Sequence, residues 1–191
     1  MADAGSAPEQ IALDRADISL FGELTEDRAR DFIDQLREVE ADGHTAIVEV
    51  TTIGGDAALA LRLVLELQIA RKRLRRRLVF VGKTQVQSAG ITLMSAFPKA
   101  DRYLSRECGL LIHCRQLERT LEISGPMRAS VPQVQALLGE MEEGLRLERE
   151  NFERLIEGSD IGIDELMQKA VRNWYLSAEE AHRRGLVAGL L

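Results

Sequence analysis

Three short segments of this sequence carry residue types that could act together as a nucleophile, a base and an oxyanion site. Ser88 lies in the tetrad Gln-Ser-Ala-Gly, between an apolar run that predicts a strand and a small-residue stretch that predicts a helix. A serine at a helix start is exposed, and the helix dipole favours negative charge that develops beside it. His113 directly follows the apolar run 110–112, and at a strand end it can face a cleft and act as a general base.

The third segment is the pair Gly54-Gly55, which follows the β-rich run 45–50 and precedes a predicted helix. Paired glycines allow a sharp turn and present bare N–H groups, and such groups near a helix N-terminus can stabilise an oxyanion. Each segment also has an ordinary structural alternative: a tight turn at the glycines, an N-cap at Ser88 and a structural role for His113. The spacing around Ser88 is not G-x-S-x-G, which disfavours the α/β-hydrolase fold.

The elements that must position these residues alternate between strands and helices. Strands are predicted at 18–21, 45–50, 78–82, 101–104 and 110–112, with a helix in each of the first three intervals. Such alternation implies an α/β fold of repeated βαβ units with right-handed crossovers. Further on, apolar residues on one helical face predict a long helix from about Pro132 to Glu157. Shorter helices are predicted over 163–171 and from Ser177, where a capping box begins the last one.

Length and composition favour one α/β domain. The chain has 191 residues, and we expect a short leader over 1–17 followed by a single domain over 18–191. A net charge of -6 argues against nucleic acid as the main partner. The N-terminus has no signal-peptide core and no apolar run could span a membrane, so we expect a cytoplasmic protein with no membrane partner. Cys108 and Cys114 match no zinc motif and the histidines lie far apart, so no metal site is expected.

The order of the three segments resembles the proteolytic subunit of the Clp protease, the ClpP family. Gly-Gly, Ser-Ala-Gly and Leu-Ile-His follow strands in succession, where that family has Pro-Gly-Gly, Ala-Ser-Met-Gly and Met-Ile-His. The tail is similar as well, since residues 174–181 and 184–187 resemble the family's Ser-Ala-x-Glu-Ala and Gly-Leu-Ile/Val ending. The resemblance runs from about residue 18 to the C-terminus.

This resemblance implies a fold of the ClpP/crotonase type and a serine peptidase site without a cofactor. Ser88 would be the nucleophile, His113 the base, and the backbone N–H groups of Gly55 and Ala89 the oxyanion hole. The long helix would be the handle through which the chain self-assembles into a ring of seven, with two rings stacked. The substrate would be a peptide or an unfolded protein. A Clp-type ATPase partner is also implied, although the short leader differs from the family's ATPase-docking loop.

The sequence departs from the family at the third member of the catalytic triad. The family has an aspartate there, and counting back from the Leu-Ser of the tail places Lys169 at that position. A lysine cannot accept the imidazole N–H or stabilise an imidazolium. Asn173 lies one helical turn further on and could orient His113, and Asp164 is the candidate if the register slips.

Three functions therefore remain open from the sequence. The first is an active serine peptidase with a modified triad. The second is a catalytically weak or inactive family member that acts as a structural ring subunit, which Lys169 favours. The third is an acyl-CoA enzyme of the crotonase type, which shares the scaffold and the oxyanion hole. The tail and the Ser88/His113 pair favour the first two functions over the third.

Overall fold

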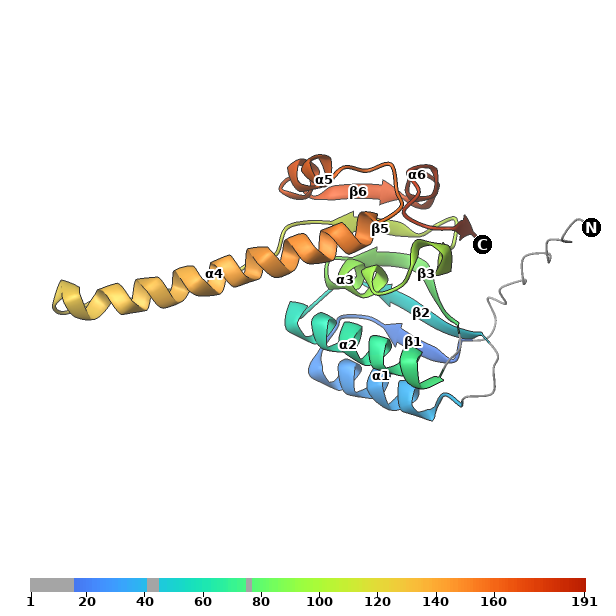
Figure 1. Cartoon of the computed structure of the whole chain (residues 1–191), viewed down its shortest axis with the longest axis horizontal. Helices are drawn as coiled ribbons and strands as arrows, with labels where there is room; N and C mark the ends of the chain where they lie inside the picture. The colour runs from blue at the N-terminus through green and yellow to red at the C-terminus, as the bar shows by residue number, and fades with distance from the viewer. Residues whose placement is uncertain (1–15, 41–44, 75–76) are drawn as a thin grey trace, which may run out of the picture.

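The computed structural model describes residues 16–40, 45–74 and 77–191, which form one mixed sheet covered by helices (Figure 1). Its strands are β1 (Ile18–Phe21), β2 (Ala46–Thr52), β3 (Leu78–Gln87), β4 (Arg102–Leu104), β5 (Gly109–Ile112), β6 (Trp174–Ser177) and β7 (Gly189–Leu190). Its helices are α1 (Glu26–Glu38), α2 (Ala57–Leu74), α3 (Ala89–Ser95), α4 (Met127–Ile156), α5 (Ile163–Ala170) and α6 (Ala178–Arg183). The predicted leader over 1–17 lies almost wholly outside the described residues.

Parallel pairing brings three strand ends together. β1, β2, β3, β4 and β7 lie side by side in parallel in that order. β3 is long enough to pair with two strands in turn, with β4 through residues 80–82 and with β5 through residues 85–87. β6 pairs antiparallel with β5 at the outer side. The carboxyl ends of β2, β3 and β5 therefore meet at one edge of the sheet.

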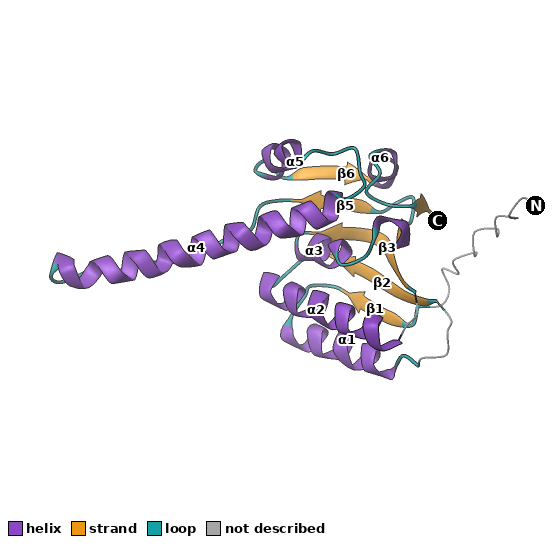
Figure 2. Ribbon diagram, viewed as in Figure 1, coloured by secondary structure: helices purple, strands orange, loops and turns teal. Residues whose placement is uncertain are grey.

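The central strands are buried because helices cover the sheet (Figure 2). The first half of β3 is wholly buried, as expected of an apolar run in a parallel strand. Helices α1 and α2 pack side by side, and each buries an apolar stripe that includes Phe32 on α1 and Leu63 and Leu67 on α2. The hydroxyl of Ser177 accepts the Glu180 N–H at 3.2 Å, which confirms the predicted cap of α6. The core thus holds the strand ends in fixed positions.

Some predicted element boundaries are wrong. Helix α4 begins at Met127 and runs through Pro132. The predicted start at Pro132 is wrong because it relied on the preference of proline for the first helical turn. Strand β3 continues past Gly82 to Gln87, because its second half pairs with β5. The prediction also missed β6 and β7, whose partners lie far away in sequence. The long helix itself is confirmed, and no described helix is long and apolar enough to cross a membrane.

A buried arginine fastens the end of α4 to the sheet. Arg102 on β4 is only 1% exposed. Its guanidinium donates to the carbonyls of Phe97 (2.7 Å), Leu155 (2.6 Å), Leu186 (3.2 Å) and Arg154 (3.1 Å). Two of these carbonyls stand in the last turn of α4, where carbonyls have no partner within the helix. Burial lowers the pKa of Arg102 to about 10, so the side chain stays charged at neutral pH and satisfies all four acceptors.

Replacing Arg102 with methionine should lower the free energy of unfolding by about 3 kcal/mol, because it leaves several buried carbonyls without a donor. Urea unfolding at matched protein concentration measures this change. The control is Arg149→Met, since Arg149 is an exposed α4 residue paired only with Glu153 at 2.9 Å, and we expect less than about 0.5 kcal/mol there. Equal effects of the two substitutions would show that Arg102 does not fasten α4.

Candidate active site

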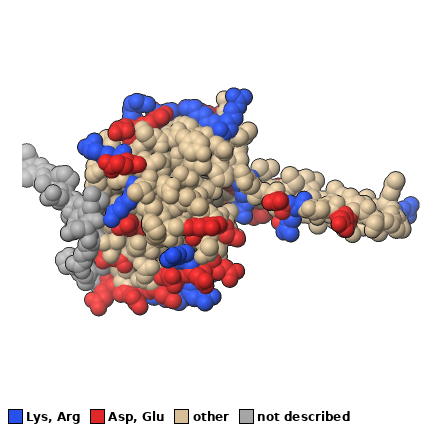
Figure 3. All heavy atoms as spheres, turned by 180° about the vertical axis from the view of Figure 1, so that it is seen from behind, with Lys and Arg blue, Asp and Glu red and all other residues tan. Residues whose placement is uncertain are grey.

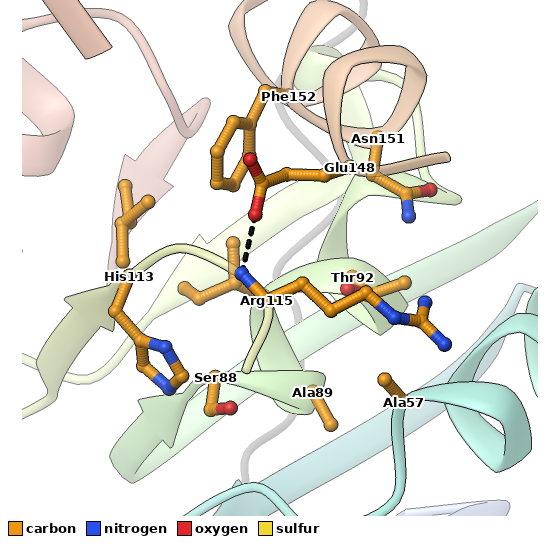
Figure 4. A pocket seen from close by; sticks show the side chains of 11 residues that line it. Ala57, Ser88, Ala89, Thr92, His113, Arg115, Glu148, Asn151 and Phe152 are labelled. Atoms are coloured by element: carbon orange, nitrogen blue, oxygen red, sulfur yellow. Dashed lines mark hydrogen bonds between the residues drawn. The ribbon is translucent and has the colours of Figure 1, made fainter. Parts of the chain in front are cut away.

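The residues predicted to do chemistry lie at the three strand ends that meet at one edge of the sheet. Gly54 and Gly55 follow β2, Ser88 follows β3 and His113 follows β5. Thr52 on β2 pairs with Val86 on β3, and residues 85–87 of β3 pair in turn with residues 109–111 of β5. Ser88 and His113 line one cavity, together with Ala89 (Figure 4).

Ser88 has an unusual backbone conformation with a free side chain. Its φ is 52° and its ψ is −115°, in a region that residues other than glycine seldom occupy. Its N–H donates to the Leu111 carbonyl at 3.0 Å, and its own carbonyl accepts the Ile91 N–H at 2.9 Å. The hydroxyl does not cap α3, and no acceptor or donor for it occurs within the described part of the chain. Ser88 therefore occupies the N-cap position of α3 without making the side-chain hydrogen bond of an N-cap serine.

Two glycines, Gly54 and Gly90, are needed because the backbone packs closely around the Ser88 turn. A Cβ on Gly54 would lie 2.6 Å from the Cβ of Ser88, and one on Gly90 would lie 2.4 Å from a methyl carbon of Thr52. Real Cβ atoms do not approach so closely, so a side chain at either position would push the serine turn away from β2. Gly54 also has a φ of +107°, which favours glycine on its own account.

The backbone N–H groups of Gly55 and Ala89, near Ser88, have no acceptor in the described ranges, and the same holds for the N–H of Gly90. The N–H of Gly54 differs, since it donates to the hydroxyl of Thr52 at 3.0 Å. The loop is held by Leu24, whose N–H donates to the Gly54 carbonyl at 2.7 Å and whose carbonyl accepts from Asp56 at 3.1 Å. The predicted oxyanion donors are therefore among the N–H groups left available, one on each side of the serine turn.

The imidazole of His113 is oriented by a main-chain carbonyl. Its Nδ1 lies 2.7 Å from the carbonyl oxygen of Cys114. A carbonyl oxygen can only accept, so the hydrogen bond requires the proton on Nδ1 and leaves the Nε2 lone pair free in the neutral ring. That is the tautomer a general base needs. The structure contains no hydrogen bond between His113 and Ser88, although Figure 4 places the ring beside the serine.

Lys169 and the two candidates for a third triad member, Asn173 and Asp164, lie outside the cavity of Ser88. Lys169 on α5 donates to Glu165 at 2.8 Å, and its Nζ lies 4.3 Å from the centroid of the Trp174 ring. Asn173, with a φ of 61°, directly precedes β6. Since Trp174 pairs with Ile112, the next position outward places Asn173 across from His113 in the backbone register. Asp164 lies in the first turn of α5 and does not line the cavity.

The cavity itself is small, about 60 Å³, and mixes apolar and charged walls. Its lining comes from α2, α3, the end of β5 and α4: Ala57, Ser88, Ala89, Ile91, Thr92, Ile112, His113, Arg115, Glu148, Asn151 and Phe152. Glu148, which is 5% exposed, was not predicted from the sequence. One of its oxygens accepts the backbone N–H of Arg115. The signal for it was present, because Glu148 interrupts the apolar stripe of α4 between Leu145 and Phe152.

The two cysteines of the chain are poor nucleophiles. Burial raises the pKa of the Cys108 thiol to about 12, which fits a core residue. Burial and then the neighbouring Glu148 carboxylate raise the pKa of the Cys114 thiol, so that it stays protonated at neutral pH. Among the residues described, no three His, Cys, Asp or Glu side chains are placed to hold a metal ion.

Comparison with known proteins agrees with this geometry. A family model described as Clp protease matches residues 7–191. The chain belongs to the Clp protease family. Its fold is similar to that of a ClpP1 mutant from Listeria monocytogenes, with a TM-score of 0.69 and 20% sequence identity over 91% of this chain and 90% of that one. The predicted Clp protease fold is thus confirmed, while comparison with curated proteins gives no match.

Proposed function

We propose that this Clp-family chain is a serine peptidase in which Ser88 is the nucleophile and His113 is the general base. The observation that carries the proposal is the hydroxyl of Ser88, which does not cap α3. The positive φ of Ser88 at the start of α3 holds this residue at the cavity that His113 also lines. A strained backbone conformation persists only where the surrounding structure maintains it, and such residues are concentrated at functional sites. The N–H groups of Gly55 and Ala89 are the proposed oxyanion donors.

The chemistry is acyl transfer in two halves. Nε2 of His113 accepts the Ser88 proton while Oγ bonds to the substrate carbonyl carbon, and the carbonyl oxygen becomes an oxyanion between the two N–H donors. The proton then passes from Nε2 to the departing amine as the amide bond breaks. Water repeats the sequence on the acyl-serine and releases the acid, so the chain is restored unchanged. The substrate class we infer is a peptide or an unfolded protein.

A fluorophosphonate probe tests this proposal directly. It modifies a serine only where a base and an oxyanion site activate the hydroxyl. We expect the modified residue, mapped by peptide mass analysis, to be Ser88. Modification of another serine, or of none, would contradict the proposal.

A second candidate function is that of a catalytically weak ring subunit with a structural role. The specific observation in its favour is the neutral partner of His113. The Cys114 carbonyl can fix the tautomer but carries no charge to stabilise an imidazolium. Lys169 is engaged with Glu165 and Trp174 and offers no acceptor. Slow Ser88-dependent turnover of a small peptide would favour this function over a fast peptidase.

We further propose that α4 mediates assembly into a ring, and into stacked rings. This helix projects from the body, and its projecting half carries few charged side chains on the face seen in Figure 3. Exposed apolar residues follow one another on it with alternating spacings of four and three: Met127, Val131, Val134, Leu138, Met141 and Leu145. This is the spacing of a helix-packing seam, which a chain without a partner would leave in water. A Clp-type ATPase is a further inferred partner, supported by the family membership alone.

Introducing a charge into this seam should break the assembly. We expect Leu138→Glu to shift the sedimentation coefficient at micromolar concentration from a large oligomer to a much smaller species, because a carboxylate would be buried without a partner. The matched control is Ala136→Glu, which adds the same charge on another face of α4 and should leave the oligomer intact. A monodisperse monomer for the unmodified chain would contradict the proposal at the outset.

A further inference from the structure

One carboxylate in the cavity of Ser88 and His113 has no role in the proposed reaction. Glu148 projects from α4 and is 5% exposed. Its Oε2 accepts the backbone N–H of Arg115, whereas its Oε1 is buried and has no hydrogen-bond partner within the described residues. The Cys114 thiol also hydrogen-bonds to the Glu148 carboxylate, but a thiol is only a weak donor. A buried carboxylate oxygen without a partner is costly, so its presence in a native protein calls for an explanation, and a role toward a ligand is one such explanation.

The charged neighbour of Glu148 does not neutralise it. Arg115 is bonded to the carboxylate through its main chain, and Figure 4 shows its side chain running away from the carboxylate toward Ala57. No ion pair joins Glu148 to a Lys or Arg side chain in the described ranges. The carboxylate therefore stands at the wall of the cavity with one unpartnered oxygen, which is covered in this structure, and with no cation of its own.

We propose that Glu148 determines specificity, and that it selects substrates with a lysine on the acyl side of the scissile bond. The inference rests on the proposed function, since the side chain beside the attacked carbonyl enters the cavity next to Ser88 and His113. An ammonium group there would donate to the free oxygen in a charge-assisted hydrogen bond. The cavity is small, which favours the compact ammonium of lysine over a guanidinium. Glu148 touches no reacting atom, so its part is recognition.

Binding to a chain that cannot cleave tests recognition apart from catalysis. The Ser88→Ala chain is mixed with three acetylated peptides that are identical except for a C-terminal lysine, norleucine or glutamate, and affinities are measured by fluorescence anisotropy. We expect the lysine peptide to bind about tenfold more tightly than the norleucine peptide. Adding Glu148→Gln should bring the two within about twofold of each other. Adding Glu153→Gln, an exposed α4 carboxylate outside the cavity, should leave the preference unchanged.

Several outcomes would overturn the inference. Equal binding of lysine and norleucine would do so, and so would binding of none of the three peptides. Preference for the glutamate peptide would show that the Arg115 side chain governs the cavity instead. If Glu148→Gln does not fold by circular dichroism, the comparison of lysine with norleucine on the Ser88→Ala chain decides alone. Cleavage assays on the unmodified chain report separately on the proposed function, because absence of Ser88-dependent cleavage would refute the peptidase while leaving the binding result intact.

Discussion

Replacing Ser88 with alanine is expected to reduce hydrolysis of a small fluorogenic peptide by about 10³-fold or more, to the level of the uncatalysed background. The reason is that no other side chain that lines the cavity in the described part of the chain is an equivalent nucleophile. The Cys114 thiol is held in its protonated form by burial and by Glu148. The Thr92 hydroxyl belongs to the second turn of α3 and lies away from the start of the helix, where the dipole favours developing negative charge.

The substitution should leave the fold in place, which makes the activity loss interpretable. Alanine and serine pay a similar penalty for a positive φ, and the hydroxyl of Ser88 makes no hydrogen bond to be lost within the described part of the chain. The melting temperature should therefore change little. Ser19→Ala, which alters an exposed serine on β1, is the matched control and should retain full activity. Undiminished cleavage by Ser88→Ala would mean that the nucleophile lies elsewhere.

The sequence predicted those parts of the site that depend on local signals. Ser88, His113 and the two glycines each directly follow an apolar strand, and strands pairing in parallel bring such ends together. The partner of His113 could not be predicted in the same way. This partner depends on the direction in which the chain leaves β5. No residue type in the sequence indicates that a main-chain carbonyl will point toward the imidazole of His113.

Glu148 was missed for a different reason. The stripe on α4 keeps one spacing from Met127 to Leu155, but its outer half is exposed and its inner half packs on the body. Periodicity fixes which face of a helix is apolar, and it does not say where along the helix the body begins. Only the contact with the segment after β5 identifies position 148 as part of a cavity wall.

Replacing Lys169 with aspartate is expected to raise the rate of peptide hydrolysis by about tenfold or more. The alignment predicted from the tail places Lys169 where the family has an aspartate. Its Nζ lies over the ring of Trp174, which pairs with Ile112 immediately before His113. A cation in that region disfavours the imidazolium that forms during attack, whereas a carboxylate would favour it. Loss of the aspartate from a complete Ser-His-Asp triad lowers the rate by about 10⁴. An increase of about tenfold would therefore restore only a small share of the rate that a complete triad provides.

The structure can accommodate this reversal of charge. Lys169 now pairs with Glu165, and an aspartate would instead face that carboxylate. Glu165 keeps two hydrogen bonds to Arg184, at 2.8 and 3.0 Å, and these, together with Lys169, lower the pKa of Glu165 to about 2. Arg184 would therefore continue to hold Glu165 after the substitution, and the pair of acids on α5 would be tolerated.

Two further variants separate the causes of any increase. Lys169→Met removes the cation without adding an acceptor, so it should recover only a small part of the gain. Asn173→Asp places a carboxylate at the position across from His113 in the register of β5 and β6, and asparagine and aspartate both tolerate the positive φ found there. If Asn173→Asp accelerates hydrolysis and a well-folded Lys169→Asp does not, position 173 faces the imidazole and the alignment that puts the missing acid at 169 is wrong. If neither does, the Cys114 carbonyl already supplies all the orientation that His113 uses, and this chain works without a third acid.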